Sequence, residues 1–278
     1  MKPLALRRAK AAFLLAALVS ASCGAPLMKL PSGPGTPAAD AAAVIAQATA
    51  ACRAVDTITL EMSVHGSAGG HRLRGRLTAG LARPASARLE AAAPFGQPLF
   101  VFVANGDDAS LLLPRDKRIL EHGKPAGVLE AVSGVPLDAA GLRALVTGCA
   151  NMPDASDAVS FGESWRVAPD GMDNVYFRKD PSTRPDGARS GQGAAAWRLV
   201  STVRRAAWRA DYSMFENSLP RAVHLVSEPA GRFDLQLDLS QVDVNVPVGP
   251  EAFRLQQTAG ADPISLEDLR RSGPLGEK

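Results

Sequence analysis

The spacing of hydrophobic and polar residues changes along this chain, and the spacing predicts which segments are helices and which are strands. From Ala39 to Arg53 the apolar residues Val44, Ile45 and Ala48 share one helical face, which predicts a helix. From residue 57 onward apolar and polar residues mostly alternate one by one, as in strands that bury a single face. The predicted strands are 57–64, 72–81, 84–90, 99–103, 111–113, 118–121, 160–167, 174–179, 196–204, 208–215, 221–226 and 232–244.

Two short helices are predicted in the middle of this series of strands. The first covers residues 125–133, and the second covers 139–147, with Asp138 as its N-cap and Gly148 after its last turn. A last short helix is predicted near Ser265, where Ser-Leu-Glu-Asp resembles a capping arrangement. The sequence therefore predicts a mainly β fold with inserted helices.

An antiparallel meander of ten or so strands tends to curl, and a curled sheet that does not close must have its concave face covered. The two middle helices are the obvious cover. Apolar side chains of the helices and of the strands would then enclose a cavity for a hydrophobic ligand. On apolarity alone, the candidates for its wall are Leu60, Met62, Leu73, Leu77, Leu129, Val132, Leu142 and Leu145.

The N-terminus has the pattern of an export signal. Basic residues precede an apolar run from Ala11 to Ala21, and small residues then lead to Cys23. The run is too short to span a bilayer, which needs about 20 apolar residues. Residues 1–22 are therefore predicted to be a removable leader, and the Pro- and Gly-containing stretch 23–38 a flexible tether. One domain would then cover 39–278, with a mobile loop at 181–193 that is rich in Ser, Pro, Gly and Arg.

Charge and composition exclude several functional classes. The whole chain has 31 Lys and Arg against 28 Asp and Glu, but four of the basic residues lie in the first ten positions. Once the leader is removed the excess disappears, which argues against a nucleic-acid-binding protein. The three Cys form no CxxC pair, and the four His are scattered, so no metal site is predicted.

Enzymatic chemistry is also not indicated. The chain contains no GxSxG nucleophile motif, and Asp107 and Asp108 lie in a predicted turn. His65 and His71 flank a predicted hairpin but have no third ligand, and the glycines of 187–193 lie in a loop and not at a strand-to-helix turn. One basic and aromatic cluster could contact anionic headgroups, although an exposed strand face beside core aromatics is the favoured interpretation. Its members are Arg204, Arg205, Arg209, Trp197 and Trp208.

The segment Val19-Ser20-Ala21-Ser22-Cys23 resembles the lipobox of bacterial lipoproteins. The resemblance implies that the leader is cut before Cys23 and that its sulfur carries a diacylglyceryl group. Ser20 departs from the Leu that is usual there, and an ordinary signal peptide with a chance cysteine is the alternative. In enteric bacteria an Asp after the cysteine retains lipoproteins in the inner membrane, so Gly24 implies transport to the outer membrane, facing the periplasm.

Residues 66–148 are similar to the family of the outer-membrane lipoprotein receptor LolB and the carrier LolA. The similarity rests on the basic strand 73–77, on Ala93-Pro94-Phe95-Gly96-Gln97-Pro98, and on the helical stretches 128–137 and 142–148. It implies an unclosed antiparallel β-barrel of about ten or eleven strands with a helical lid over an apolar cavity. It also implies a non-enzymatic function without a cofactor. A LolA-like periplasmic carrier would deliver lipoproteins, and this protein would insert their acyl chains into the outer membrane.

One further feature follows from this resemblance, and another departs from it. The loop Pro94-Phe95-Gly96 would assist membrane insertion, with Phe95 in place of the more familiar Leu; alternatively, Phe95 packs under its own turn. Cys52 and Cys149 are not expected in the enteric receptor. With Cys23 lipidated they would be the remaining pair in an oxidising compartment, which favours a disulfide between the N-terminal helix and the end of the lid. Two buried free cysteines are the alternative.

Two other functions remain open from the sequence. A protein of the same fold could bind lipids or glycolipids without transferring lipoproteins, or could be a structural lipoprotein with an interaction surface. A genome that encodes the cognate carrier would favour lipoprotein transfer, whereas a cavity filled by its own side chains would favour the structural role.

Overall fold

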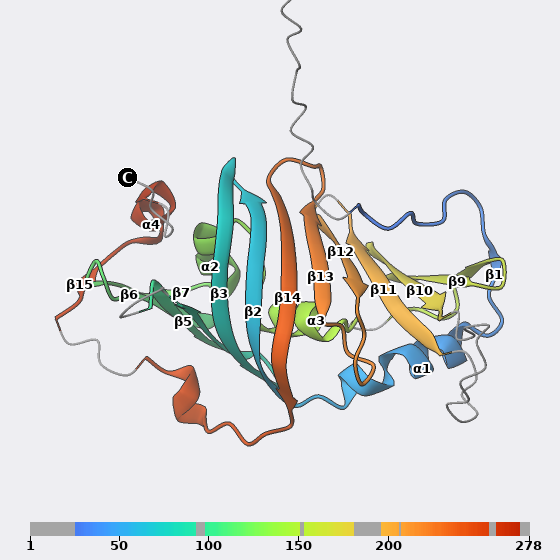
Figure 1. Cartoon of the computed structure of the whole chain (residues 1–278), viewed down its shortest axis with the longest axis horizontal. Coiled ribbons are helices and arrows are strands. Elements are labelled where there is room, and N and C mark those ends of the chain that lie inside the picture. Colours follow the sequence, from blue (N-terminus) through green and yellow to red (C-terminus); the bar gives the residue numbers. More distant parts are fainter. Residues whose placement is uncertain are drawn as a thin grey trace, which may run out of the picture.

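The computed structural model describes residues 26–92, 98–150, 153–180, 196–205, 207–255 and 260–272. They form one sheet with four α-helices and a short 3₁₀ helix (Figure 1). The strands are β1 Thr36–Pro37, β2 Thr57–Ala68, β3 His71–Ala82, β4 Ser86–Ala92, β5 Phe100–Asn105, β6 Asp108–Leu113, β7 Arg118–Gly123, β8 Val159–Phe161, β9 Trp165–Asp170, β10 Asp173–Lys179, β11 Trp197–Arg204, β12 Trp208–Ser213, β13 Ala222–Ser227, β14 Phe233–Val244 and β15 Asp262–Pro263. The helices are α1 Ala41–Arg53, α2 Pro125–Ser133, α3 Ala139–Thr147, the 3₁₀ helix η1 Pro250–Phe253 and α4 Leu266–Ser272.

The sheet is open. Its strand order is β1-β8-β9-β10-β11-β12-β13-β14-β2-β3-β4-β5-β6-β7-β15, so β1 and β15 are its two edges. Neighbouring strands are antiparallel except β15, which pairs with β7 in parallel. The pairing of β14 with β2 joins the two halves of the meander. The predicted mainly β, antiparallel and unclosed architecture is therefore confirmed.

The predicted number of ten or eleven strands is wrong, because the described sheet has 15. The segment 160–167 forms two strands, β8 and β9, which turn back on each other near Gly162 at a φ of 60°. The two edge strands β1 and β15 have two residues each, too few to produce an alternation in the sequence. The predicted unclosed barrel of ten or eleven strands is thus replaced by a longer open sheet.

The predicted helices are confirmed, together with their capping residues. Asp138 Oδ1 accepts a hydrogen bond from the Gly141 N–H at 2.6 Å, and Gly148 ends α3 at a φ of 62°. Ser265 Oγ accepts the Asp268 N–H at 3.1 Å, which fixes the start of α4. Local sequence therefore decides where these helices begin and end.

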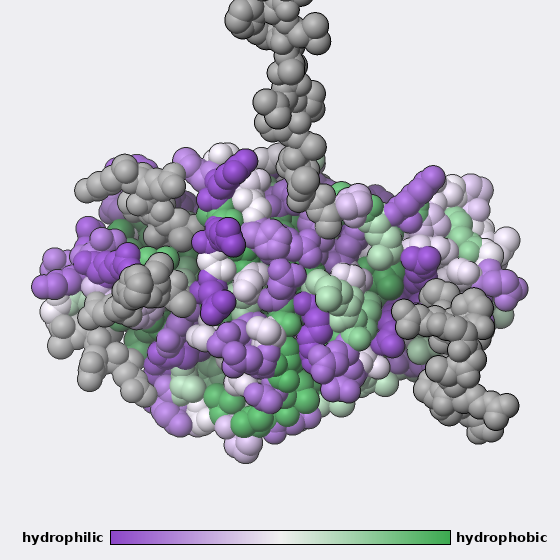
Figure 2. All heavy atoms as spheres, in the orientation of Figure 1, coloured by the Kyte–Doolittle hydropathy of each residue, from purple (hydrophilic) through white to green (hydrophobic). Residues whose placement is uncertain are grey.

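The helices α2 and α3 lie in the hollow of the curved sheet, on the far side of the strands in Figure 1. α3 packs on β3 and β4, α2 packs on β6, and α1 packs on β9, β10 and β11. The other face of the sheet is exposed and mostly hydrophilic (Figure 2). The main core consequently lies between the concave face and the helices, and includes the fully buried Phe102 and Phe177.

The predicted tether is shorter than its sequence range suggests. Thr36–Pro37 forms β1 on β8, and the Met28 N–H donates to Asp211 Oδ2 at 2.8 Å. The chain is therefore held against the sheet from Met28 onward. Composition could not show this, because the attachment depends on Asp211, 183 positions away.

The C-terminal segment wraps around the opposite end of the sheet. Arg88 donates to the carbonyl oxygens of Ala252 and Arg254, which holds η1 beside β4. Further on, β15 joins β7, and Arg270 of α4 pairs with Glu130 of α2 at 3.7 Å. None of the helices in the described ranges is long and apolar enough to cross a membrane.

Candidate functional site

An apolar cavity of about 150 Å³ lies between the concave face of the sheet and the two middle helices. Its strand wall consists of Met62, Val64, Leu73, Gly75, Leu77, Leu89, Ala91, Phe100, Leu225, Leu235 and Leu237, together with Leu99 just before β5. Alternation explains this wall, since every second residue of β2 and β3 faces the hollow. Met62 lies directly opposite Leu77 across the two strands, and both line the cavity.

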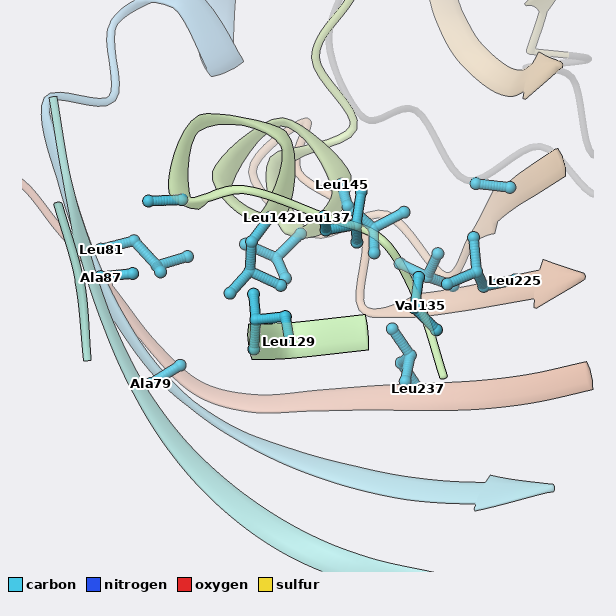
Figure 3. Packing of buried hydrophobic residues seen from close by; sticks show 14 of the residues in the cluster. Ala79, Leu81, Ala87, Leu129, Val135, Leu137, Leu142, Leu145, Leu225 and Leu237 are labelled. Carbon is cyan, nitrogen blue, oxygen red and sulfur yellow. The ribbon is translucent and has the colours of Figure 1, made fainter. Parts of the chain in front are cut away.

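The lid wall comes from α2, α3 and the connection between them. In Figure 3 its labelled side chains lie between the helices and the strands, facing Leu225 and Leu237. The residues are Leu129 and Val132 of α2, Val135 and Leu137 of the connection, and Leu142 and Leu145 of α3. The helical pairs are three residues apart, which places both members of each pair on one face.

Seven of the eight residues predicted for the cavity wall line this cavity. The exception is Leu60, which is 4% exposed and lies in the closed core, opposite Ala79. Leu60 and Met62 face the same side of β2. The side chains are closely packed at Leu60, whereas at Met62 they leave space for the cavity. Alternation identifies which residues face the concave side of the sheet. It does not show which of them line a cavity and which are closely packed, so this difference could not be predicted from the sequence.

Several lining residues were not predicted. Val135 and Leu137 lie in a loop, where neither helical nor strand periodicity applies, although two large apolar residues next to Gly134 and Pro136 were a usable signal. Leu225, Leu235 and Leu237 come from β13 and β14, which reach the cavity only because β14 pairs with β2. Long-range pairing of this kind has no local signature.

Cys52 and Cys149 form a disulfide, with their Cα atoms 5.6 Å apart, so this prediction is confirmed. Cys52 belongs to the last turn of α1, and Cys149 directly follows Gly148 at the end of α3. One end of the lid is therefore covalently attached to a helix outside the cavity.

The other predicted site residues lie outside the described residues. This applies to the leader, Cys23, the loop Pro94-Phe95-Gly96 and the loop 181–193.

Of the remaining candidates for chemistry, His65 and His224 have carboxylate partners. His65 lies 3.6 Å from Asp238 and His224 lies 2.8 Å from Asp234, both as neighbours on the sheet. Asp107 is in the turn between β5 and β6. In the parts of the chain that the structure describes, no group of three or more His, Cys, Asp or Glu could hold a metal ion.

The basic and aromatic cluster is also accounted for by packing. Arg209 pairs with Asp211 at 2.7 Å, and Arg204 pairs with Asp173 at 3.3 Å. Trp208 is buried in the core and Arg204 stacks over its ring. Arg204, Arg209 and Trp208 therefore have partners within the fold, whereas Arg205 is exposed.

No protein-family model matches the chain, and no curated protein matches it. Several solved structures match the chain. A LolA superfamily protein from Nitrosomonas europaea has 13% sequence identity, covers 77% of this chain and 97% of its own, and superposes with a TM-score of 0.50. A DUF1329 family protein from Desulfovibrio piger has 10% identity, with 79% and 98% coverage and a TM-score of 0.46.

An outer membrane lipoprotein-sorting protein domain from Vibrio parahaemolyticus has 13% identity, with 72% and 89% coverage and a TM-score of 0.38. The Nitrosomonas structure shows that this chain has the fold of the LolA superfamily, an open antiparallel sheet around a helical lid. The predicted LolA/LolB-like resemblance is thereby confirmed for the fold, without singling out the LolB receptor.

Proposed function

We propose that this protein is an outer-membrane-anchored lipoprotein that binds acyl chains in the cavity under its lid, without covalent chemistry. Its fuller task is to receive lipoproteins from a periplasmic carrier and insert them into the membrane. The observation that carries the proposal is the cavity itself, whose wall is apolar apart from Ser133, Arg74 and Arg76. The LolA-superfamily fold and the lipobox ending at Cys23 support the same conclusion.

The energetics favour an acyl chain as the ligand. Each CH₂ group buried from water contributes about 0.8 kcal/mol. At about 150 Å³ the cavity is smaller than ordinary ligand pockets, which start at about 300 Å³. A full chain therefore requires the lid to move away from the sheet. Because the disulfide holds the end of α3, the movement falls on α2 and on the connection at Gly134.

The test is native mass spectrometry of a form that starts at residue 24, which retains every described element, after expression in a periplasm. We expect co-purified lipid or acylated peptide. Leu73→Glu places a charge on the half-buried cavity wall and should abolish co-purification. Thr78→Glu, on the exposed face of the same strand, is the matched control. An empty protein that also takes no lipoprotein from a loaded carrier would overturn the proposal.

The delivery step has its own test at Phe95. Phe95→Glu should impair the transfer of lipoprotein to vesicles and leave acyl-chain binding and folding intact, because a charge opposes insertion into the membrane interface. Phe95→Leu, which retains an apolar side chain, should transfer normally. Unchanged delivery by the Glu variant would remove the proposed role of this loop.

A second candidate is a lipid-binding lipoprotein of the same fold that transfers no lipoproteins. It is favoured by the presence of Arg74 and Arg76 beside the cavity, since a charged headgroup is a feature of many lipids.

A further inference from the structure

The inner face of β3 has a gap in its row of apolar side chains. Leu73, Gly75 and Leu77 occupy successive inward positions and all line the cavity. Gly75 is exposed, and a Cβ atom built on it would meet no atom within 4 Å. An exposed position on the inner face means that the cavity reaches solvent there. The mouth of the cavity therefore lies at Gly75.

Two arginines adjoin this mouth. Arg74 and Arg76 line the cavity on either side of Gly75, and Arg72 follows one step further along the strand. All three are exposed, and as alternate residues of a strand their Cα atoms are about 7 Å apart. They form a basic row on outward-facing positions of β3, beside the mouth of an otherwise apolar cavity.

Nothing in the described structure neutralises this row. Across β2, the residues opposite Arg72, Arg74 and Arg76 are Ser67, His65 and Ser63. None of these three arginines forms an ion pair with a described carboxylate, whereas nine others do. Guanidinium groups bind phosphate and carboxylate oxygens through paired, charge-assisted hydrogen bonds.

We infer that the ligand of this cavity is an amphiphile with an anionic headgroup, whose acyl chain enters at Gly75 and whose headgroup is bound by Arg72, Arg74 and Arg76. The inference rests on the proposed acyl-chain binding and adds the chemical class of the headgroup. It favours a phospholipid-like or fatty-acid ligand over one with a neutral head.

The experiment compares lysophosphatidylglycerol, which is anionic, with lysophosphatidylcholine, which is zwitterionic, both with the same acyl chain and below the concentration at which they form micelles. We expect the form starting at residue 24 to bind the anionic lipid at least about tenfold more tightly, because both heads carry a phosphate but only choline adds a cation, which opposes binding beside the three arginines. The preference should weaken as salt rises, since exposed charges are screened.

Arg72→Gln/Arg74→Gln/Arg76→Gln should remove the preference and leave binding of the zwitterionic lipid within about twofold. The matched control is Arg53→Gln/Arg115→Gln/Arg205→Gln, which makes the same change in net charge at exposed positions elsewhere. Gly75→Phe should block the mouth and weaken binding of both lipids. Gly80→Phe is its control, because a Cβ at this outward-facing glycine of β3 also meets no atom within 4 Å.

Equal affinity for the two lipids, or a preference that survives in the arginine triple variant, would overturn the inference. So would competition by inorganic phosphate alone at the affinity of the lipid, or an anionic preference seen with vesicles and not with monomeric lipid. These outcomes differ from failure of the proposed function, in which neither lipid binds the wild-type protein at all.

Discussion

Asp211 shows how one buried carboxylate holds a distant part of the chain. Its side chain is 8% exposed and accepts hydrogen bonds from Ser201 Oγ at 2.6 Å and from the Met28 N–H at 2.8 Å. Arg209 completes the group with two bonds to the carboxylate of Asp211 and one to the Met28 carbonyl oxygen. The N-terminal segment is therefore attached to the outer face of β12 by a satisfied ionic cluster.

Asp211→Ala should lower the free energy of unfolding by about 3 kcal/mol, because Arg209 is left as an unpaired, largely buried charge. It should also release the N-terminal segment, which trypsin would then cleave faster after the exposed Lys29. Denaturant unfolding and limited proteolysis measure the two effects, with the exposed Asp243→Ala as control. Arg209→Met/Asp211→Leu should recover much of the stability and remain sensitive to trypsin. Slow cleavage of that double variant would contradict the attachment.

Asp40, directly before α1, provides a pH-dependent contact. Hydrogen bonds from the Arg166 guanidinium, at 2.6 and 2.9 Å, hold the pKa of this carboxyl below its ordinary value. A folded-state pKa below the unfolded one stabilises the fold above the unfolded pKa, and this contribution is lost as the pH falls through the folded pKa.

Asp40→Asn should therefore lower the free energy of unfolding at neutral pH by up to about 1 kcal/mol. The effect is small because the carboxylate is half exposed and solvent screens its charge. The difference from wild type should shrink as the pH falls below about 4. Urea unfolding of both proteins from neutral pH to below about pH 4 measures this difference in the free energy of unfolding. A difference that stays constant with pH would mean that the ionic contact contributes nothing.

Among the elements of the lid, α3 and α2 are held in different ways. The disulfide at Cys149 fixes the end of α3 to α1, whereas α2 is held by non-covalent contacts with β6 and α4, including the Glu130–Arg270 pair. The unequal attachment makes α2 the element that can move when a ligand enters.

Cys52→Ser/Cys149→Ser should lower the free energy of unfolding by up to about 4.7 kcal/mol, because the bond closes a loop of 97 positions in the unfolded chain. Denaturant unfolding measures the loss, and wild-type protein under reducing conditions should behave like the double variant. Amide exchange in α3 should accelerate more than in α2. An unchanged unfolding midpoint would show that the bond does not stabilise the fold, and equal exchange in α2 and α3 would show that it does not constrain the lid.

For the whole molecule, the attachment at Met28 limits the distance between the domain and its predicted lipid anchor. Cys23 precedes Met28 by five residues, which span at most about 18 Å. Leu27 lines a surface pocket together with Ser67 and the turn Pro229-Ala230, and the Gly69 N–H donates to the Arg232 carbonyl oxygen at 2.8 Å. With Cys23 lipidated as proposed, the anchor would leave the domain at the end of the sheet where β2 turns into β3, the end nearest the cavity mouth.

In vesicles, this end should face the membrane. A fluorophore at Ala230→Cys should be quenched by a quencher carried in the lipid, and one at Val246→Cys, beyond the far end of β14, should not. Both positions are exposed, and the native Cys52 and Cys149 are protected by their bond. Equal quenching would show that the attached segment does not orient the lipidated protein.

The elements of this protein follow from its sequence because their signals are local. Alternation located β2, β3 and β14, and Asp138 and Gly148 bounded α3 through hydrogen bonds within a few residues. Alternation did not predict the two-residue strands β1 and β15, since so short a strand is decided by its partner.

By itself, the sequence determined the longer strands, the helices, the apolar faces and the pair of cysteines, because periodicity and capping act over a few residues. Only the tertiary structure decided where the concave face separates from the lid, which places Met62 in the cavity wall and Leu60 in the core. It also decided that Gly75 opens the wall and that Met28 meets Asp211. These features depend on the curvature of the whole sheet and on contacts between distant residues, which no local pattern records.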